Sequence, residues 1–340
     1  MLRPSGQARV LPVDPQVPDE RAVEAAVEVL RSGGLVGLPT ETVYGLAARA
    51  LDPRALARVF SAKGRPTSHP LIAHVSELAE AQRLAAAWPE AAALLAGAFW
   101  PGPLTLVVTR ASHVPAEVGG GGPSVAVRAP AHPVARAVIA ALGEPVAAPS
   151  ANRYQGLSPT EAAHVVQELG DAVDLVLDAG PCEAGIESTV VDVRAGAPRV
   201  LRPGALGIAR LRSVVPDIVF AFERLQGEEV RASPGMQDRH YAPRATLLLE
   251  ESAEQATTVA VSLVSRGKRV GLVLRGLVSP APGVLVRVLP DDVGGYAHAL
   301  YGTLRALDDA GATSIVVARV PEDDSWLAVA DRLARAAAKA

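Results

Sequence analysis

The sequence predicts an α/β protein in which short buried strands alternate with helices, followed by a second, smaller α/β unit. The first observation is that apolar runs of strand length alternate with helical repeats along the 340 residues. The second is that 49% of the residues are hydrophobic but only 4% are aromatic, so Ala, Val and Leu must fill a large core. The length favours about two domains, on a prior of roughly 150 residues each.

Charge and composition exclude several classes of protein. The formal net charge of -3 gives no global attraction to nucleic acid. The single cysteine, Cys182, excludes an internal disulfide and a cysteine-cluster zinc site, and it fits a reducing cytoplasm. The N-terminus lacks a signal-peptide core, and no segment reaches the ~18 uninterrupted apolar residues of a membrane span. We therefore expect a cytoplasmic protein that does not contact membranes.

The stretch Leu35–Ala48, read LVGLPTETVYGLAA, organises the first unit. Its apolar run closes at Pro39, as a buried strand does, and we expect a helix to begin soon afterwards. Thr40, Glu41 and Thr42 would then lie at a helix N-terminus, where unpaired backbone N–H groups bind an anion. The alternative is that one of the threonines only caps the helix.

Two helices flank this stretch, and the second leads into a basic loop. Asp19 is the candidate N-cap of the first helix, and the second is predicted over Pro53–Phe60. The loop Ser61–Pro70 holds Lys63 and Arg65, where Gly and Pro prevent a regular helical ion-pair face. Two cations at the mouth of a sheet fit a phosphate clamp, and the alternative is a solvated basic loop.

The next strands also carry polar residues at their ends. His69 lies in the loop and His74 in a strand, without the register of a zinc motif, so no metal site is predicted. Arg128 ends a strand of small apolar residues that begins at Ser124. A buried arginine at that point either pairs with a buried carboxylate or meets an anionic ligand, because an unpaired one is costly.

A third polar strand end follows at Ser150 and Asn152, which place a hydroxyl and an amide where ligands bind in open α/β sheets. Ser150 is interpreted as a hydrogen-bonding residue and not as a nucleophile, because the G-x-S-x-G turn is absent. Ser158 is predicted to be the N-cap of a helix, with Pro159 in its first turn and Glu161 completing a capping box. With Ser188 and Arg202 at later strand ends, these residues predict a domain that binds a multiply charged anion.

Seven motifs in order resemble the YrdC-type family over residues 17–213: PTETVYGL, KGRPTSHPLIAHV, WPGPLTLV, VAVRAPAHP, APSAN, ESTVVDV and LRPG. A later string, SPGMQDRHYAP at 233–243, resembles the linker in the long, two-domain form of the threonylcarbamoyl-AMP synthase family. The resemblance implies a YrdC-like twisted open sheet with helices over 17–213, a linker or lid over the active site at 214–244, and a small Rossmann-like C-terminal α/β domain at 245–340.

The resemblance also implies an activity. That family converts L-threonine, bicarbonate and ATP to threonylcarbamoyl-AMP and pyrophosphate, the first step of threonylcarbamoyl-adenosine formation in tRNAs that read ANN codons. It implies a nucleotidyltransferase that uses Mg²⁺ with ATP and has no dedicated protein metal site. A downstream tRNA threonylcarbamoyl-transferase complex is the implied partner, and direct tRNA binding is expected to be weak or absent.

Carried over motif by motif, the resemblance gives Lys63 and Arg65 the catalytic role of stabilising charge on the phosphates. The residues implied to bind ATP are Lys63, Arg65, His69, Ser124, Ser150, Asn152, Ser158, Arg202 and Tyr241. The residues implied to bind L-threonine are Thr40, Thr42, His74, Arg128, Ala148 and Ser188, with Arg128 on the carboxylate. Deleting the lid segment 233–243 is expected to abolish synthesis and leave both domains folded.

Two other interpretations stay open. A carbamoyltransferase of the hydrogenase-maturation type also contains a YrdC-type domain, but it would need a cysteine-rich zinc region that the single Cys182 argues against. A non-enzymatic RNA-binding module is disfavoured by the net charge and by the absence of an RNP-like aromatic pattern. The C-terminal unit has neither a P-loop nor a dinucleotide fingerprint, so no catalysis is assigned to it.

Overall fold

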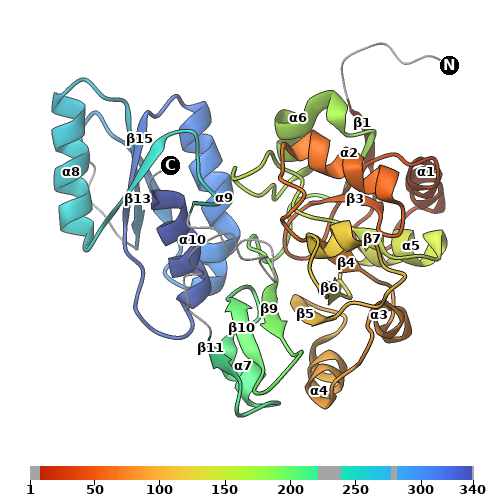
Figure 1. Cartoon of the computed structure of the whole chain (residues 1–340). Coiled ribbons are helices and arrows are strands. Elements are labelled where there is room, and N and C mark those ends of the chain that lie inside the picture. The colour runs from red at the N-terminus through yellow and green to blue at the C-terminus, as the bar shows by residue number, and fades with distance from the viewer. Residues whose placement is uncertain (1–7, 221–238, 277–281, 339–340) are drawn as a thin grey trace. The chain divides into compact units, whose positions relative to one another are not determined.

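The computed structural model describes residues 8–220, 239–276 and 282–338, which form two compact units (Figure 1). One unit lies within 1–154, 159–183 and 187–236, and the other within 155–158, 184–186 and 237–340. Two short segments that precede residue 237 in the chain, one of them containing Ser158, therefore group with the second unit. No helix of the described residues is long and apolar enough to cross a bilayer. Both units mix helices with strands, which confirms the predicted α/β class.

The first unit is built on an 11-stranded sheet in the order β1-β8-β2-β3-β7-β4-β6-β5-β9-β10-β11. Its strands are β1 (Arg9–Pro12), β2 (Val36–Leu38), β3 (Gly45–Arg49), β4 (Ile72–His74), β5 (Leu104–Thr109), β6 (Ser124–Arg128), β7 (Val146–Ala147), β8 (Leu175–Asp178), β9 (Thr189–Asp192), β10 (Arg199–Arg202) and β11 (Val219–Phe220). The sheet mixes parallel and antiparallel pairs, and strands that are far apart in sequence are neighbours in it. For example, β4 pairs parallel with β6 and antiparallel with β7.

The helices of this unit cover the sheet unequally. They are α1 (Glu20–Arg31), α2 (Pro53–Lys63), α3 (Leu78–Leu84), α4 (Glu90–Phe99), α5 (Pro133–Leu142), α6 (Ala162–Leu169) and α7 (Ile208–Arg212), with short 3-10 turns at Ala116–Gly119 and Gly170–Ala172. On one face, α1 and α5 lie side by side and share an apolar cluster with β2, β3, β7 and β8 (Figure 1). The strands β4, β5, β6 and β9 carry a separate small cluster: Ile72, Val107, Ala126 and Val190, packed against Leu201.

The helix predicted to begin soon after Thr42 is wrong. The chain instead bends over 41–43 and enters strand β3, which pairs antiparallel with β2 and β7. Ala47 joins the cluster under α1 and α5, whereas Leu46 and Ala48 join the core on the opposite face. Because both faces of β3 are buried as far as Ala48, its sequence is apolar up to Arg49, and such a run cannot be told from a buried helix by periodicity alone.

Two further helix boundaries differ from the prediction. Lys63 was expected in a loop, but it is the last residue of α2, which Asp52 caps and which ends only at Gly64 in the left-handed conformation. The predicted cap at Ser158 is also wrong, because α6 begins at Ala162. The reason is tertiary: the carbonyl group of Pro159 accepts from the N–H of Tyr44, and that of Thr160 from the N–H of Cys182.

The second unit contains a 4-stranded parallel sheet in the order β12-β15-β13-β14. Its elements are β12 (Thr246–Glu250), α8 (Ala253–Ser265), β13 (Val270–Arg275), β14 (Leu285–Leu289), α9 (Val293–Asp309), β15 (Ser314–Ala318) and α10 (Leu327–Ala337). Tyr241 is buried in this unit, where its ring stacks on Tyr301 and lies 4.8 Å under the Arg332 guanidinium. Most of the predicted lid, at 221–238, lies outside the described residues.

Candidate active site

Polar side chains of four neighbouring strands share one face of the first sheet. The pairing of β4 with β6 sets His74 beside Arg128. Side chains alternate along a strand, so His74 lies on the same face as Ile72, and Arg128 on the same face as Ala126. These two apolar residues belong to the small cluster that is separate from α1 and α5. The same alternation brings Thr105 and Ser188 to this face, on β5 and just before β9.

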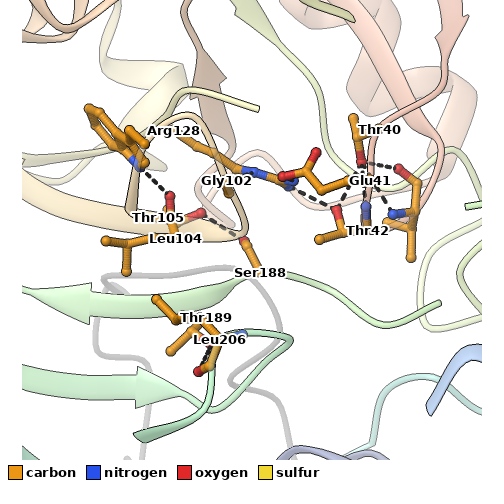
Figure 2. A network of polar contacts seen from close by, with 12 residues as sticks. Thr40, Glu41, Thr42, Gly102, Leu104, Thr105, Arg128, Ser188, Thr189 and Leu206 are labelled. Carbon is orange, nitrogen blue, oxygen red and sulfur yellow. Dashed lines mark hydrogen bonds and ion pairs between the residues drawn. The ribbon is translucent and has the colours of Figure 1, made fainter. Parts of the chain in front are cut away.

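Arg128 is the centre of this polar group (Figure 2). Its Nη1 donates to the hydroxyl oxygen of Thr42 at 2.9 Å, and its Nε donates to the carbonyl oxygen of Gly102 at 3.3 Å. Its Nη2 lies 2.6 Å from Oε1 of Glu41 in an ion pair whose side chains are 4% and 10% exposed. The guanidinium is therefore held from three directions on a face of the sheet.

A bend that contains Thr40 fixes the position of Thr42. The Thr40 hydroxyl donates to the carbonyl oxygen of Val43 at 2.6 Å and accepts from the N–H groups of Thr42 and Val43 at 3.2 Å. The hydroxyl oxygens of Thr40 and Thr42 lie 2.9 Å apart. Thr40 thus orders the bend, and Thr42 presents its hydroxyl to Arg128.

Arg202 and Ser188 form a second buried pair at the start of β9. The guanidinium of Arg202 donates to the Ser188 carbonyl oxygen at 2.8 and 3.2 Å, and its Nη2 lies 3.2 Å from the Ser188 hydroxyl. The same hydroxyl lies 2.8 Å from that of Thr105 (Figure 2). One residue predicted for ATP and one predicted for L-threonine are therefore in direct contact.

Lys63 reaches the strand end at Ser150 and Asn152 from α2. Its Nζ donates to the backbone carbonyl oxygens of Ser150 and Asn152 at 2.5 and 2.6 Å. Burial, with a further effect from the nearby Arg65 cation, holds the Lys63 pKa well below its usual value. An anion beside Lys63 would favour its charged form and so oppose this shift.

Arg65 and His69 lie in the loop that follows α2. The Nη2 of Arg65 donates to the Pro70 carbonyl oxygen at 2.9 Å, and the Nδ1 of His69 lies 3.0 Å from the Tyr154 hydroxyl. The N–H of Tyr154 also donates to the carbonyl oxygen of Lys63 at 2.8 Å. Tyr154 therefore joins the basic loop to the end of α2.

His74 is a neutral hydrogen-bond acceptor at this face. Its Nδ1 lies 3.1 Å from the carbonyl oxygen of Ile72, which can only accept, so Nδ1 carries the proton and Nε2 has a free lone pair. Burial, with the Arg128 cation as a second cause, lowers the His74 pKa to about 3. The ring is therefore uncharged at neutral pH.

The remaining predicted residues are Ser124, Ala148, Ser158 and Tyr241. Ser124 begins β6, four residues from Arg128 on the same strand face, and is buried. Ala148 donates its N–H to the Ile72 carbonyl oxygen at 3.1 Å. Ser158 and Tyr241 belong to the second unit, and their predicted contacts with ATP stay predictions.

Sequence reasoning assigned no role to two residues of this network, Glu41 and Thr105. Glu41 stands between two threonines that were assigned to the site, so its position was visible but its partner was not. Thr105 interrupts the apolar strand β5, and a lone hydroxyl in a buried strand was the available signal.

This fold and this polar face define an α/β protein that gathers buried cations and hydroxyl groups on one face of a mixed sheet. A family model described as telomere recombination matches residues 28–204, and one described as threonylcarbamoyl-AMP synthase, C-terminal domain, matches 207–338. Threonylcarbamoyl-AMP synthase of Pyrococcus abyssi is 38% identical over 325 residues, covering 94% of each chain, and that of Bacillus subtilis is 35% identical over 329 residues, covering 95% of this chain and 93% of the relative.

The crystal structure of P. abyssi Sua5 complexed with L-threonine superposes with a TM-score of 0.91 at 37% identity, covering 96% of this chain and 97% of that one. The chain belongs to the threonylcarbamoyl-AMP synthase family, in its two-domain form.

Proposed function

We propose that this protein is an L-threonylcarbamoyladenylate synthase, a nucleotidyltransferase that makes threonylcarbamoyl-AMP and pyrophosphate from L-threonine, bicarbonate and ATP. The observation that carries the proposal is the contact of Arg202 with Ser188, because a predicted ATP residue and a predicted L-threonine residue adjoin there. Membership of the family and the likeness to a relative's L-threonine complex support it.

The chemistry needs positioning more than a protein nucleophile. The amine nitrogen of L-threonine adds to the carbon of bicarbonate or carbon dioxide and loses a proton, which gives a carbamate. A carbamate oxygen then attacks the α-phosphorus of ATP, and the bond from that phosphorus to the pyrophosphate oxygen breaks. Such a reaction gains most from fixed cations and from holding the reactants together.

The residues of the chain divide this work. Arg128, held by Thr42, takes the carboxylate of L-threonine, and neutral His74 offers an acceptor nitrogen to its amine or hydroxyl group. Lys63 and Arg65 take the phosphates, whose negative charge favours the charged form of Lys63 against the effect of burial. Ser188 takes L-threonine beside the phosphates, since its hydroxyl contacts Arg202.

Mg²⁺ enters this proposal as a companion of ATP. The described residues contain no group of three His, Cys, Asp or Glu side chains that could hold a metal ion, and the one carboxylate of the polar network, Glu41, is paired with Arg128. This donor set fits Mg²⁺ held by phosphate oxygens and water. When bound, the ion would neutralise charge on the phosphates.

Further parts of the proposal follow from the product. Threonylcarbamoyl-AMP is consumed by a tRNA threonylcarbamoyl-transferase complex, so we place the reaction in the cytoplasm with weak or no direct tRNA binding. The labile product favours rapid transfer to that complex.

Pyrophosphate release tests the proposal. Wild type is assayed with ATP and Mg²⁺, with L-threonine and bicarbonate each present or omitted, beside Lys63→Ala and the matched control Lys268→Ala, whose side chain is exposed in the second unit. Release that requires both co-substrates, collapses in Lys63→Ala and persists in Lys268→Ala is the expected result. Release that is indifferent to L-threonine would refute the synthase.

A further inference from the structure

Glu41 is a buried carboxylate that the reaction described above does not use. Its side chain is 10% exposed and lies at the centre of the polar face, 2.6 Å from the Nη2 of Arg128 (Figure 2). Burial alone would raise the Glu41 pKa, but the charge and N–H groups of Arg128 together with nearby backbone N–H groups offset this effect, and the pKa lies below its usual value. Glu41 is therefore ionised at neutral pH beside the cation that is proposed to bind the substrate carboxylate.

The contacts of Arg128 leave donors unused. Nε donates to Gly102 and Nη1 to Thr42, whereas Nη2 faces Glu41 in an ion pair without a hydrogen bond of normal geometry. Since Nη1 and Nη2 carry two N–H groups each, one N–H on each terminal nitrogen has no partner among the residues of the described ranges. Two such groups are what a carboxylate needs for bidentate binding.

Glu41 has spare capacity as well. Among the described residues, neither of its carboxylate oxygens makes a hydrogen bond of normal geometry, although both are buried. The N–H groups of Glu41 and Ala131 lie near enough to stabilise the charge without completing such a bond. A buried acceptor of this kind is costly unless a donor arrives, and an ammonium group brings three.

The distance between the charged atoms of Arg128 and Glu41 matches the distance between the charged atoms of an α-amino acid. In an α-amino acid the ammonium nitrogen and the nearer carboxylate oxygen are about 2.7 Å apart, as standard bond lengths require. The ion pair of Arg128 and Glu41 has a separation of 2.6 Å with the opposite order of charges. The two zwitterions can therefore lie side by side, with the carboxylate on Arg128 and the ammonium on Glu41.

We propose that Glu41 is a specificity residue that makes this subsite neutral overall and selects a zwitterionic α-amino acid over an anion of the same shape. The inference rests on the proposed function, because it takes L-threonine as the ligand of Arg128. Without Glu41 the subsite would keep the charge of Arg128 alone, which attracts any carboxylate and repels an ammonium group. With Glu41, a hydroxy acid places a neutral hydroxyl with one donor beside the buried carboxylate, in place of a charged ammonium group with three.

The test compares two ligands on three proteins. The full-length wild type, Glu41→Gln and Glu41→Asp are titrated calorimetrically with L-threonine and with the matching 2,3-dihydroxybutanoate, in which a hydroxyl replaces the ammonium group. In wild type we expect L-threonine to bind at least tenfold more tightly. In Glu41→Gln we expect this preference to fall by at least tenfold, because L-threonine loses affinity and the hydroxy acid gains it; Glu41→Asp keeps the preference.

The outcomes separate a specificity role from a structural one. If Glu41 only supports the fold, both ligands weaken together in Glu41→Gln and their ratio is unchanged, which would overturn the inference. ATP affinity and the thermal unfolding temperature of each variant show whether the protein is intact, and a variant that does not fold is replaced by Glu41→Asp, whose retained preference is then required. If wild type binds no L-threonine, the proposed function fails and the inference with it.

Discussion

His74 should make the first unit lose stability in mild acid. Its pKa is lowered from the ordinary 6.5 to about 3 by burial and by Arg128. Below pH 6.5 the unfolded chain binds a proton on this histidine and the folded chain does not, so stability falls as pH falls, until the pH reaches about 3. The slope is about 1.4 kcal/mol per pH unit. Between pH 7.5 and 5.0 the loss through His74 alone is therefore about 2 kcal/mol.

The measurement is urea unfolding of full-length protein at both pH values. Trp326→Phe in the second unit leaves Trp88 and Trp100 of the first unit as the tryptophan probes. His74→Gln in that background should lose about 2 kcal/mol less than its parent over the same interval. The comparison cancels other groups, including His132, whose pKa burial also lowers.

An equal loss of stability in the parent and in His74→Gln would refute the reasoning. Such a result would mean that the histidine is solvated or that it becomes protonated in the folded state. His132→Gln is the matched control, because its ring caps α5 through the N–H of Val134 and is more exposed than His74. It should give a smaller change.

Three further predictions follow from the same contacts. ATP binding at pH 8 should be accompanied by proton uptake at Lys63, because burial lowers its pKa and a bound phosphate would raise it again. Calorimetry would show this uptake as a binding enthalpy that depends on the ionisation enthalpy of the buffer. The same dependence in a Lys63→Gln protein would contradict the prediction. Gly204→Ala should weaken L-threonine binding and destabilise the first unit by about 1–3 kcal/mol, since a Cβ there would overlap the backbone of Ser188; Gly207→Ala, which meets no atom within 4 Å, is the control. Asp331→Asn should destabilise the second unit by about 3 kcal/mol, because it removes the carboxylate that pairs with the buried guanidinium of Arg332. The exposed pair of Arg244 and Asp309 is the control, where Asp309→Asn should cost less than about 1 kcal/mol in urea unfolding.

Local signals in the sequence determined much of the fold. Helix α1 runs from its predicted cap at Asp19, whose side chain accepts from the N–H of Arg21, to a stop at Gly33. Apolar runs bounded by turn residues also predicted β6, which runs from Ser124 to Arg128, and the parallel strands of the second unit. These elements depend on neighbours in the chain, which is why their residues were sufficient to predict them.

The sequence also determined which residue types would gather at strand ends, but not which of them would meet. Thr42 and Arg128 are 86 positions apart, and Ser188 lies 83 positions from Thr105. The order of the strands in the sheet decides which of these residues meet. No local sequence pattern reveals that order, because the connections between strands cross over their neighbours. The motif that contains Glu41 was visible in the sequence, whereas its ion pair with Arg128 appears only when β6 is in place.

Tertiary structure decided two of the three local predictions that were wrong. The stretch after Thr42 is a strand because it is buried on both sides, and its apolar pattern fits either state. The backbone at Pro159 and Thr160 bonds to distant segments, so the helix starts at Ala162 and Ser158 does not cap it. Lys63 ends a helix because Gly64 adopts the left-handed conformation one turn beyond the predicted stop. In the first two cases hydrogen bonds or burial set by the whole fold outweighed a local preference of about 1 kcal/mol, whereas the glycine that ends α2 was a local signal.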